Sequence, residues 1–393
     1  MNHHDTQQNE EGLLLSGLDG ANPLGFLAAL GTLCTLSAAR PQRNIKMRWH
    51  LKKATCTPEI IGWDDNATVG ETIAEHIGCA QCGRRPESDT SPQSINDTKR
   101  SLSEKRFQKH RTALKKARDS IKARGMRGKA REDAEARELT PMNDRLEKRR
   151  KIWLIRLRRS VPSPELALGK HLNASIEELR EQFRVNLAEA SLSRREVVDL
   201  LSAFGSDVCP NRDGKKMAAT PFCFTSGSGH QYFLDSIRQL LESLAGYDIH
   251  EVLINNVERR DERLSMRWNP IEDRRYAMMW DDPTAQDNKA TTNWVLNLLA
   301  YRGLQLYPSV PTGLGLATPG WSRGNFWAWP IWDGYIGVDI VRSTLAHVDI
   351  TNYQKRQSSL QQRGIVAIYE SRRILVGTPP LHKINFTPSR RIV

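Results

Sequence analysis

The clearest hydrophobic run of the chain lies near its N-terminus, where residues 23–39 carry no charge. Asn22 is a residue type that caps helices, Pro23 suits a first helical turn, and Arg40-Pro41 ends the pattern. The run is at the short limit for a membrane span, and the acidic residues before it are unlike the basic start of a signal peptide. We therefore expect a buried helix that is close-packed through its small residues: Gly25, Ala28, Ala29 and Gly31.

Shorter periodicities along the rest of the chain predict further elements. Alternation of apolar and polar residues predicts strands over 12–18 and 45–55. Apolar residues three to four positions apart predict one or two amphipathic helices over 175–207. Over 226–246 they predict a Gly-Ser loop that leads into a helix, and over 291–311 a helix that ends near Gly303 and is followed by an extended stretch. Two short strands around a basic turn are expected over 364–377. Together these patterns predict an α+β fold that is predominantly helical.

Between residues 99 and 159 the pattern changes to single apolar residues, seven apart, in a charged background. Two series share this spacing: Phe107, Leu114 and Ile121, then Leu139, Leu146 and Trp153. Such a stripe is too narrow for a core helix but fits a two-helix hairpin, with Gly125 and Gly128 near the turn. We therefore expect three parts: a mixed α/β N-terminal domain (1–95), a protruding basic helical hairpin (96–160) and a mainly helical C-terminal domain with short terminal strands (161–393).

The charge of the chain is concentrated in this predicted hairpin. The 393 residues carry a net charge of +13, yet residues 99–159 hold 23 Lys and Arg against 8 Asp and Glu, a net +15 that leaves −2 for the remainder. A solvated helical arm without a ligand would usually balance its signs. The imbalance favours a polyanionic partner, since Lys and Arg gain affinity for nucleic acid by releasing its condensed counterions.

The candidate nucleic-acid-binding residues come mostly from the predicted hairpin, where they would contact phosphates without reading sequence. On the first helix and the turn they are Lys105, Arg106, Lys109, Arg111, Lys115, Lys116, Lys122, Arg124 and Arg127. On the return helix they are Lys148, Arg149, Arg150, Arg156, Arg158 and Arg159. Lys215 and Lys216, and Ser226 and Ser228 in a Gly-Ser loop before a helix, complete the set.

Motifs for chemistry are sparse. Six irregularly spaced cysteines form no disulfide framework, which favours a reducing cytoplasm. Cys79 and Cys82 supply half of a tetrahedral zinc site, but no second pair matches them, so we expect no metal and no cofactor, with zinc held by these two thiols as the alternative. Walker, HD and HNH motifs are absent, and the adjacent Asp281 and Asp282 would point apart. We expect no catalysis, and we interpret the aromatic cluster at 321–332 as core rather than as a base-stacking platform.

Three stretches and the C-terminal segment resemble proteins of type I CRISPR–Cas systems. The stretches are "GLDGANPLGFLAALGTL", "TPFCFTSGSGHQYFLDSIRQLL" and "WPIWDGYIGVDIVRSTL", and the segment is residues 369–391. The most similar group is the large subunit of the type I-U (I-G) systems, or a closely related accessory subunit, because the chain is short for a large subunit. None of these motifs is catalytic, and the basic segment 99–159 does not match the family pattern.

The resemblance implies a subunit of Cascade, the crRNA-guided surveillance complex of the cytoplasm. Its large subunit contacts duplex DNA at the protospacer-adjacent motif, stabilises the R-loop and helps recruit a helicase–nuclease, while guide pairing reads most of the sequence. The implied partners are crRNA, target double-stranded DNA and the other Cascade subunits, including the multi-copy backbone protein, with no membrane. The alternatives are an RNA-binding or ribonucleoprotein assembly protein with a basic arm, a metal-dependent nuclease built on Asp281 and Asp282, and a subunit whose arm binds an acidic protein.

Overall fold

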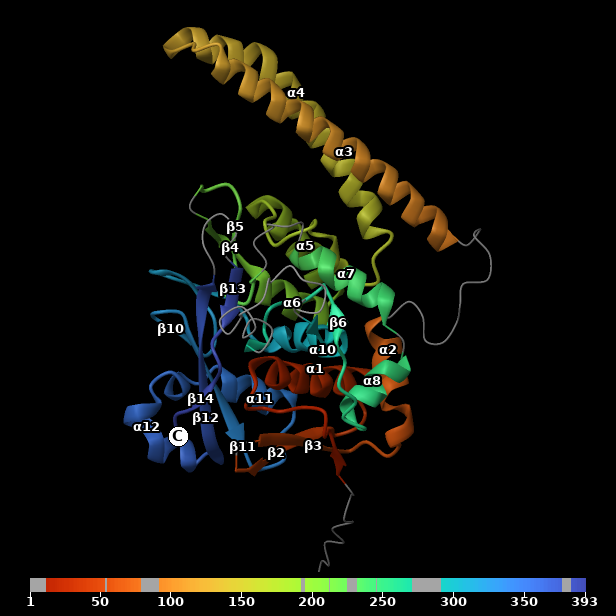
Figure 1. Cartoon of the computed structure of the whole chain (residues 1–393), viewed down its shortest axis with the longest axis vertical. Helices are drawn as coiled ribbons and strands as arrows, with labels where there is room; N and C mark the ends of the chain where they lie inside the picture. Colours follow the sequence, from red (N-terminus) through yellow and green to blue (C-terminus); the bar gives the residue numbers. More distant parts are fainter. Residues whose placement is uncertain are drawn as a thin grey trace, which may run out of the picture. The chain divides into compact units, whose positions relative to one another are not determined.

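The computed structural model describes most of the chain, in these ranges: 12–53, 55–78, 92–191, 195–211, 213–224, 232–244, 246–270, 291–376 and 383–393. The fold is α+β and predominantly helical, as the sequence predicted (Figure 1). Two compact units divide it: Met1–Arg84 together with Lys170–Val393 form unit 1, and Arg85–Gly169 form unit 2.

The segments before and after the hairpin were expected to be separate domains, but they lie in one unit. Helix α1 (Pro23–Ala39) packs along α10 (Trp294–Gly303), and Trp329 hydrogen-bonds to Gly20 across more than 300 positions of sequence. Long-range packing of this kind leaves no local signal in the sequence. The hairpin is thus an insertion, in sequence, into a unit built from both ends of the chain.

Helix α1 is the buried helix predicted from the first hydrophobic run. The side chain of Asn22 accepts a hydrogen bond from the backbone N–H of Leu24 at 2.9 Å, and every residue from Pro23 to Leu36 is buried. A helix that is apolar all round belongs in a core or a membrane. No helix among the described residues is long and apolar enough to cross a bilayer.

Glycines let α1 and α10 approach backbone to backbone. A Cβ atom on Gly31 would lie 1.8 Å from the carbonyl oxygen of Leu299, and one on Gly303 would lie 2.3 Å from that of Leu27. Gly25 has a different role, because its Cβ would meet the carbonyl oxygen of Asp19 in the turn before the helix. The close approach predicted through small residues is therefore confirmed at Gly31.

Two antiparallel sheets contain most of the paired strands. The first has the order β1-β3-β2 and comprises β1 (Leu13–Leu14), β2 (Lys46–Lys52) and β3 (Thr55–Ile61). The second is built from β10 (Trp321–Ser322), β11 (Phe326–Trp332), β12 (Ile365–Val376), β13 (Lys383–Phe386) and β14 (Arg390–Arg391). Strand β12 pairs with β11, β13 and β14.

Strand β12 differs from the two short strands expected over 364–377. It is one 12-residue strand, whose first part pairs with β11 up to Phe326 and Arg372 and whose second part pairs with β13 from Arg373 and Phe386. Strand β11 pairs with β12 up to Arg372, and β13 pairs with it from Arg373 onward. Because β12 is paired on both sides of this point, the basic Arg372-Arg373 stays extended where its sequence predicted a turn.

The aromatic cluster of β11 forms the centre of the core, which confirms that interpretation. Trp327, Trp329 and Trp332 are buried, and the rings of Trp327 and Trp329 stack with centroids 4.5 Å apart. The indole N–H of Trp329 donates to the carbonyl oxygen of Gly20 at 2.8 Å, and that of Trp332 to Met47 at 2.9 Å. These bonds tie the second sheet to the N-terminal segment.

The remaining elements of unit 1 are short. In the described part of unit 1, the other helices are α2 (Val69–Ile77), α5 (Ile176–Glu189), α6 (Glu196–Phe204), α7 (Phe233–Ser243), α8 (Gly246–Leu253), α11 (Val338–Leu345) and α12 (Tyr353–Gln361), with 3₁₀ turns η1 (Asn66–Thr68), η6 (Leu304–Leu306) and η7 (Val348–Ile350). Three small antiparallel pairs are β4 (Gly205–Pro210) with β5 (Met217–Ala219), β6 (Asp261–Glu262) with β7 (Thr291–Thr292), and β8 (Val310–Thr312) with β9 (Gly315–Ala317). The helices predicted over 175–207 are confirmed as α5 and α6, and the helix predicted within 226–246 is confirmed as α7. The helix predicted to end near Gly303 is confirmed as α10, which ends at that residue.

A partly buried ion-pair network joins three of these helices. Glu196 of α6 pairs with Arg302 of α10 at 2.7 Å and with His76 of α2 at 3.2 Å. Burial disfavours the charged carboxylate of Glu196, but the hydrogen bonds and charges of His76 and Arg302 outweigh it and lower the pKa of that carboxyl to about 2.

We expect acid to destabilise unit 1 through Glu196. A carboxyl whose pKa falls on folding stabilises the folded state fully above its unfolded pKa of about 4.5, and progressively less as the pH falls to about 2. The difference corresponds to about 3 kcal/mol. In urea denaturation, the Glu196→Gln variant should lose this part of the pH dependence of the unfolding free energy. A variant with the same pH dependence as the wild-type chain would contradict the assignment.

Candidate nucleic-acid interface

Unit 2 is built around the helical hairpin that the seven-residue spacing predicted. It comprises α3 (Pro92–Ala123) and α4 (Gly128–Arg158), followed by the 3₁₀ turn η2 (Pro164–Ala167). Gly125, in the connection between the helices, and Gly128, the first residue of α4, both adopt positive φ, at 65° and 56°. Only glycine takes this left-handed conformation without steric cost, so the two glycines reverse the chain as expected.

Two small apolar clusters hold α3 against α4. One contains Phe107, Trp153 and Leu157, with the rings of Phe107 and Trp153 stacked at a centroid distance of 5.4 Å. The other contains Leu114, Ile121 and Leu139, and the partly buried Leu146 packs against both. Because Ile121 meets Leu139 near the turn and Phe107 meets Trp153 far from it, the two helices run antiparallel (Figure 1).

So narrow a core leaves the cationic side chains at the surface. The predicted contact residues are exposed on α3 and the turn, at Lys148 and Arg158 of α4, and at Arg159 directly after it. Arg149, Arg150 and Arg156 are half-buried. The hairpin therefore gathers 15 of the 19 candidate nucleic-acid-binding residues on one small structural unit.

Most of these cations are not neutralised by a neighbouring carboxylate. Arg124 is an exception, because its guanidinium donates to both carboxylate oxygens of Glu138, at 2.5 and 3.2 Å. Twelve of the predicted residues make no ion pair with a described residue: Lys105, Arg106, Lys109, Arg111, Lys115, Lys116, Lys122, Arg127, Lys148, Arg149, Arg158 and Arg159. Unpaired exposed cations at this density repel one another, which a polyanion would relieve.

The other candidates do not join the hairpin. Lys215 and Lys216 are exposed on the turn between β4 and β5, where the backbone N–H of Asn211 donates to the carbonyl oxygen of Lys216 at 2.7 Å, and they belong to unit 1. Ser226, Ser228, Cys79, Cys82, Asp281 and Asp282 lie outside the described residues.

The described residues bring together no group of three His, Cys, Asp or Glu side chains that could hold a metal ion. Four cysteines among them are buried and form no disulfide with a described residue: Cys34, Cys56, Cys209 and Cys223. Burial raises the pKa of the Cys34 thiol to about 12 and that of Cys56 to about 11. Thiols held protonated in this way are poor nucleophiles and poor metal ligands.

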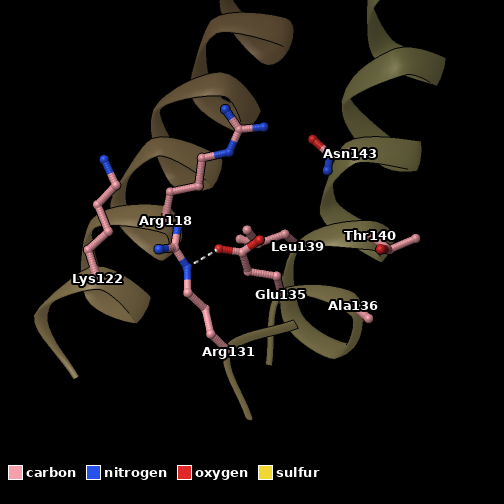
Figure 2. A pocket seen from close by; sticks show the side chains of 8 residues that line it. All are labelled: Arg118, Lys122, Arg131, Glu135, Ala136, Leu139, Thr140 and Asn143. Atoms are coloured by element: carbon pink, nitrogen blue, oxygen red, sulfur yellow. Dashed lines mark hydrogen bonds and ion pairs between the residues drawn. The ribbon is translucent and has the colours of Figure 1, made fainter. Parts of the chain in front are cut away.

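A groove on the hairpin brings in residues that the sequence analysis missed. It has a volume of about 420 Å³ and lies between α3 and α4, as Figure 2 shows. Besides the predicted Lys122, its lining includes two cations and two neutral polar residues not singled out before: Arg118, Arg131, Thr140 and Asn143. The spacing of cations at 111, 115, 118 and 122 is a signal that could have identified this edge of α3.

Comparison with protein-family models, with curated proteins and with solved structures finds no match to this chain. Its function must therefore be inferred from the charge and geometry of the hairpin and from the short stretches of sequence described above.

Proposed function

We propose that this chain is a non-catalytic nucleic-acid-binding subunit of a type I CRISPR surveillance complex in the cytoplasm. In this role the hairpin contacts target duplex DNA next to the protospacer, and the chain stabilises the R-loop and helps recruit the helicase–nuclease. The observation that carries the nucleic-acid part is the net charge of +15 over residues 99–159, on a hairpin where most of the cations have no carboxylate partner among the described residues.

Counterion release is the reason why this charge favours binding to nucleic acid. Each phosphate neutralised by Lys or Arg frees condensed cations, so affinity falls steeply as salt rises. Flexible Lys and Arg side chains on a helix surface reach phosphates without reading base edges, so the hairpin supplies affinity and orientation rather than sequence preference. This division suits a complex in which base pairing with crRNA carries the sequence information.

The surveillance-complex part rests on the type I CRISPR–Cas resemblance of the stretches 17–33, 220–241 and 329–345. It adds crRNA, target DNA, the multi-copy backbone protein and the helicase–nuclease as partners. The same cationic hairpin also supports a second candidate, an RNA-binding or ribonucleoprotein assembly protein, because basic helices suit structured RNA.

The first test is binding of the full-length protein to labelled duplex DNA, single-stranded DNA and double-stranded RNA, titrated between about 50 and 200 mM salt. We expect the logarithm of the binding constant for duplex DNA to fall with the logarithm of the salt concentration with a slope of about −5 or steeper, from roughly six phosphate contacts. Adding Mg²⁺ or Mn²⁺ should produce no cleavage, and cleavage would favour the nuclease alternative. Binding without salt dependence would overturn the nucleic-acid proposal.

The second test is affinity purification of the tagged chain from its native host, followed by RNA sequencing and mass spectrometry. We expect uniform guide RNAs flanked by repeat sequence, together with a multi-copy backbone subunit. Recovery of ribosomal or mixed RNA would instead favour the second candidate and would overturn the surveillance-complex part.

A further inference from the structure

One edge of α3 carries a regular row of cations. Arg111, Lys115, Arg118 and Lys122 follow one another at intervals of four, three and four residues, which places them on one edge of the helix. All four are exposed, and none makes an ion pair with a described residue. At 1.5 Å per residue the row spans about 16 Å.

This row leads into the groove between α3 and α4. Figure 2 shows Arg118 and Lys122 on α3 and Arg131 in the first turn of α4 around the same hollow. Glu135 is the one carboxylate among the lining residues, and it pairs with Arg131 at 2.8 Å. The lining thus has three cations and one anion, and its excess of positive charge lies on the α3 wall, because Arg131 and Glu135 balance each other on α4.

Neutral polar groups complete the lining. Thr140 and Asn143 contribute a hydroxyl and an amide, and neither side chain makes a hydrogen bond to a described residue. Hydroxyl and amide groups commonly donate to phosphate and sugar oxygens. Buried Leu139 closes the groove toward the core.

We infer that the groove and the row bind the sugar–phosphate backbone of nucleic acid, and that Glu135 weakens this binding by holding Arg131. The inference deepens the proposed function and rests on it. A row of about 16 Å matches about five nucleotides of one strand at 3.4 Å per nucleotide. Because an exposed pair within one helix is weakly held, an incoming phosphate can replace the Glu135 carboxylate as the partner of Arg131.

The test compares two fourfold variants of the full-length chain. The row variant is Arg111→Gln, Lys115→Gln, Arg118→Gln and Lys122→Gln. The control variant is Lys105→Gln, Arg106→Gln, Lys109→Gln and Lys116→Gln, which removes the same charge from exposed, unpaired positions of the same helix. Helicity of each variant is checked by circular dichroism.

We expect the row variant to flatten the log–log salt slope by about 3.6 for duplex DNA, or about 2.8 for a single strand. Its affinity at about 100 mM salt should fall by about 100-fold or more, and that of the control variant by less than about 10-fold. Equal losses in both variants would overturn the inference and leave the proposed function standing. Absence of salt-dependent binding by the wild-type chain would overturn the proposed function itself.

A gain of binding provides a second measurement that misfolding cannot imitate. Glu135→Gln removes the carboxylate and frees Arg131, so affinity should rise about three- to tenfold and the slope should steepen by about 0.9. Asp144→Asn removes an exposed, unpaired charge from the same helix, about 13 Å further along, and should have less than half this effect. Equal gains from both variants would show only a general charge effect and would overturn the role of Glu135.

Discussion

The Gly31→Val variant is expected to leave unit 1 unfolded at 25 °C. A Cβ atom at this position would lie 1.8 Å from the carbonyl oxygen of Leu299, 2.7 Å from its carbonyl carbon and 2.9 Å from the backbone nitrogen of Gly303. These are backbone atoms of α10, which no side-chain rotation can move away. Relief requires α1 and α10 to separate, and the packing of a helix buried on all sides would be lost.

The expected cost is at least about 4 kcal/mol, above the usual range for overpacking, because the obstacle is backbone. A loss of this size is close to the whole unfolding free energy of many domains. Circular dichroism and thermal unfolding measure it. Gly313→Ala is the control, since a Cβ there meets nothing within 4 Å, and it should change the unfolding free energy by less than about 0.5 kcal/mol. A Gly31→Val chain with a cooperative transition near the wild-type temperature would contradict the close approach of α1 and α10.

The Trp153→Ala variant is expected to separate the two helices of the hairpin at the end far from the turn. Trp153 is one of three buried side chains in its cluster, so nothing nearby fills the space that its ring would leave. Truncating a buried Trp costs about 3–5 kcal/mol. Hydrogen exchange followed by mass spectrometry should show lost protection in α3 and α4 with α1 and α10 unchanged, and binding of nucleic acid should weaken.

Trp153→Phe is the matched control for the aromatic ring. It keeps a ring against Phe107 and removes an indole N–H that is buried without a hydrogen-bond partner among the described residues. The lost ring volume and the removed polar group act in opposite directions, so we expect a change of less than about 1.5 kcal/mol. A Trp153→Ala hairpin that keeps wild-type protection would show that the cluster does not hold the helices together.

Local signals in the sequence were sufficient for helix α1, for the amphipathic helices α5, α6, α7 and α10, and for the hairpin. The cap at Asn22, the seven-residue series from Phe107 to Trp153 and the turn glycines act within a few residues, where sequence spacing and spatial contact coincide. The sequence predicted strands over 364–377 but missed their continuity as the single strand β12, for the opposite reason. Its extended path through Arg372 is set by β11 and β13, which approach it from other parts of the chain.

The candidate site, too, could be predicted from the sequence only in part. Charge density identified the hairpin, because 23 cations in 61 residues need no fold to be seen. The groove could not be predicted from the sequence, since it depends on which edge of α3 faces Thr140 and Asn143 of α4. The pairing of Arg124 with Glu138 likewise depends on the register of two helices across a turn. Sequence reasoning counted Arg124 among the contacts with no sign of its partner.

The bonds from Trp329 to Gly20 and from Trp332 to Met47 bear on how the chain folds during its synthesis. They join residues 309 and 285 positions apart. At a synthesis rate of about 5–20 residues per second, Gly20 and Met47 leave the ribosome roughly 15 to 60 s before the tryptophans that bond to them. The segment of the apolar helix α1 is synthesised almost as long before α10, against which it packs. During that time its apolar side chains can aggregate or bind chaperones. The hairpin, whose contacts are local, can form as soon as it emerges. The cations of the hairpin would therefore be exposed to solvent before the rest of the chain has been synthesised.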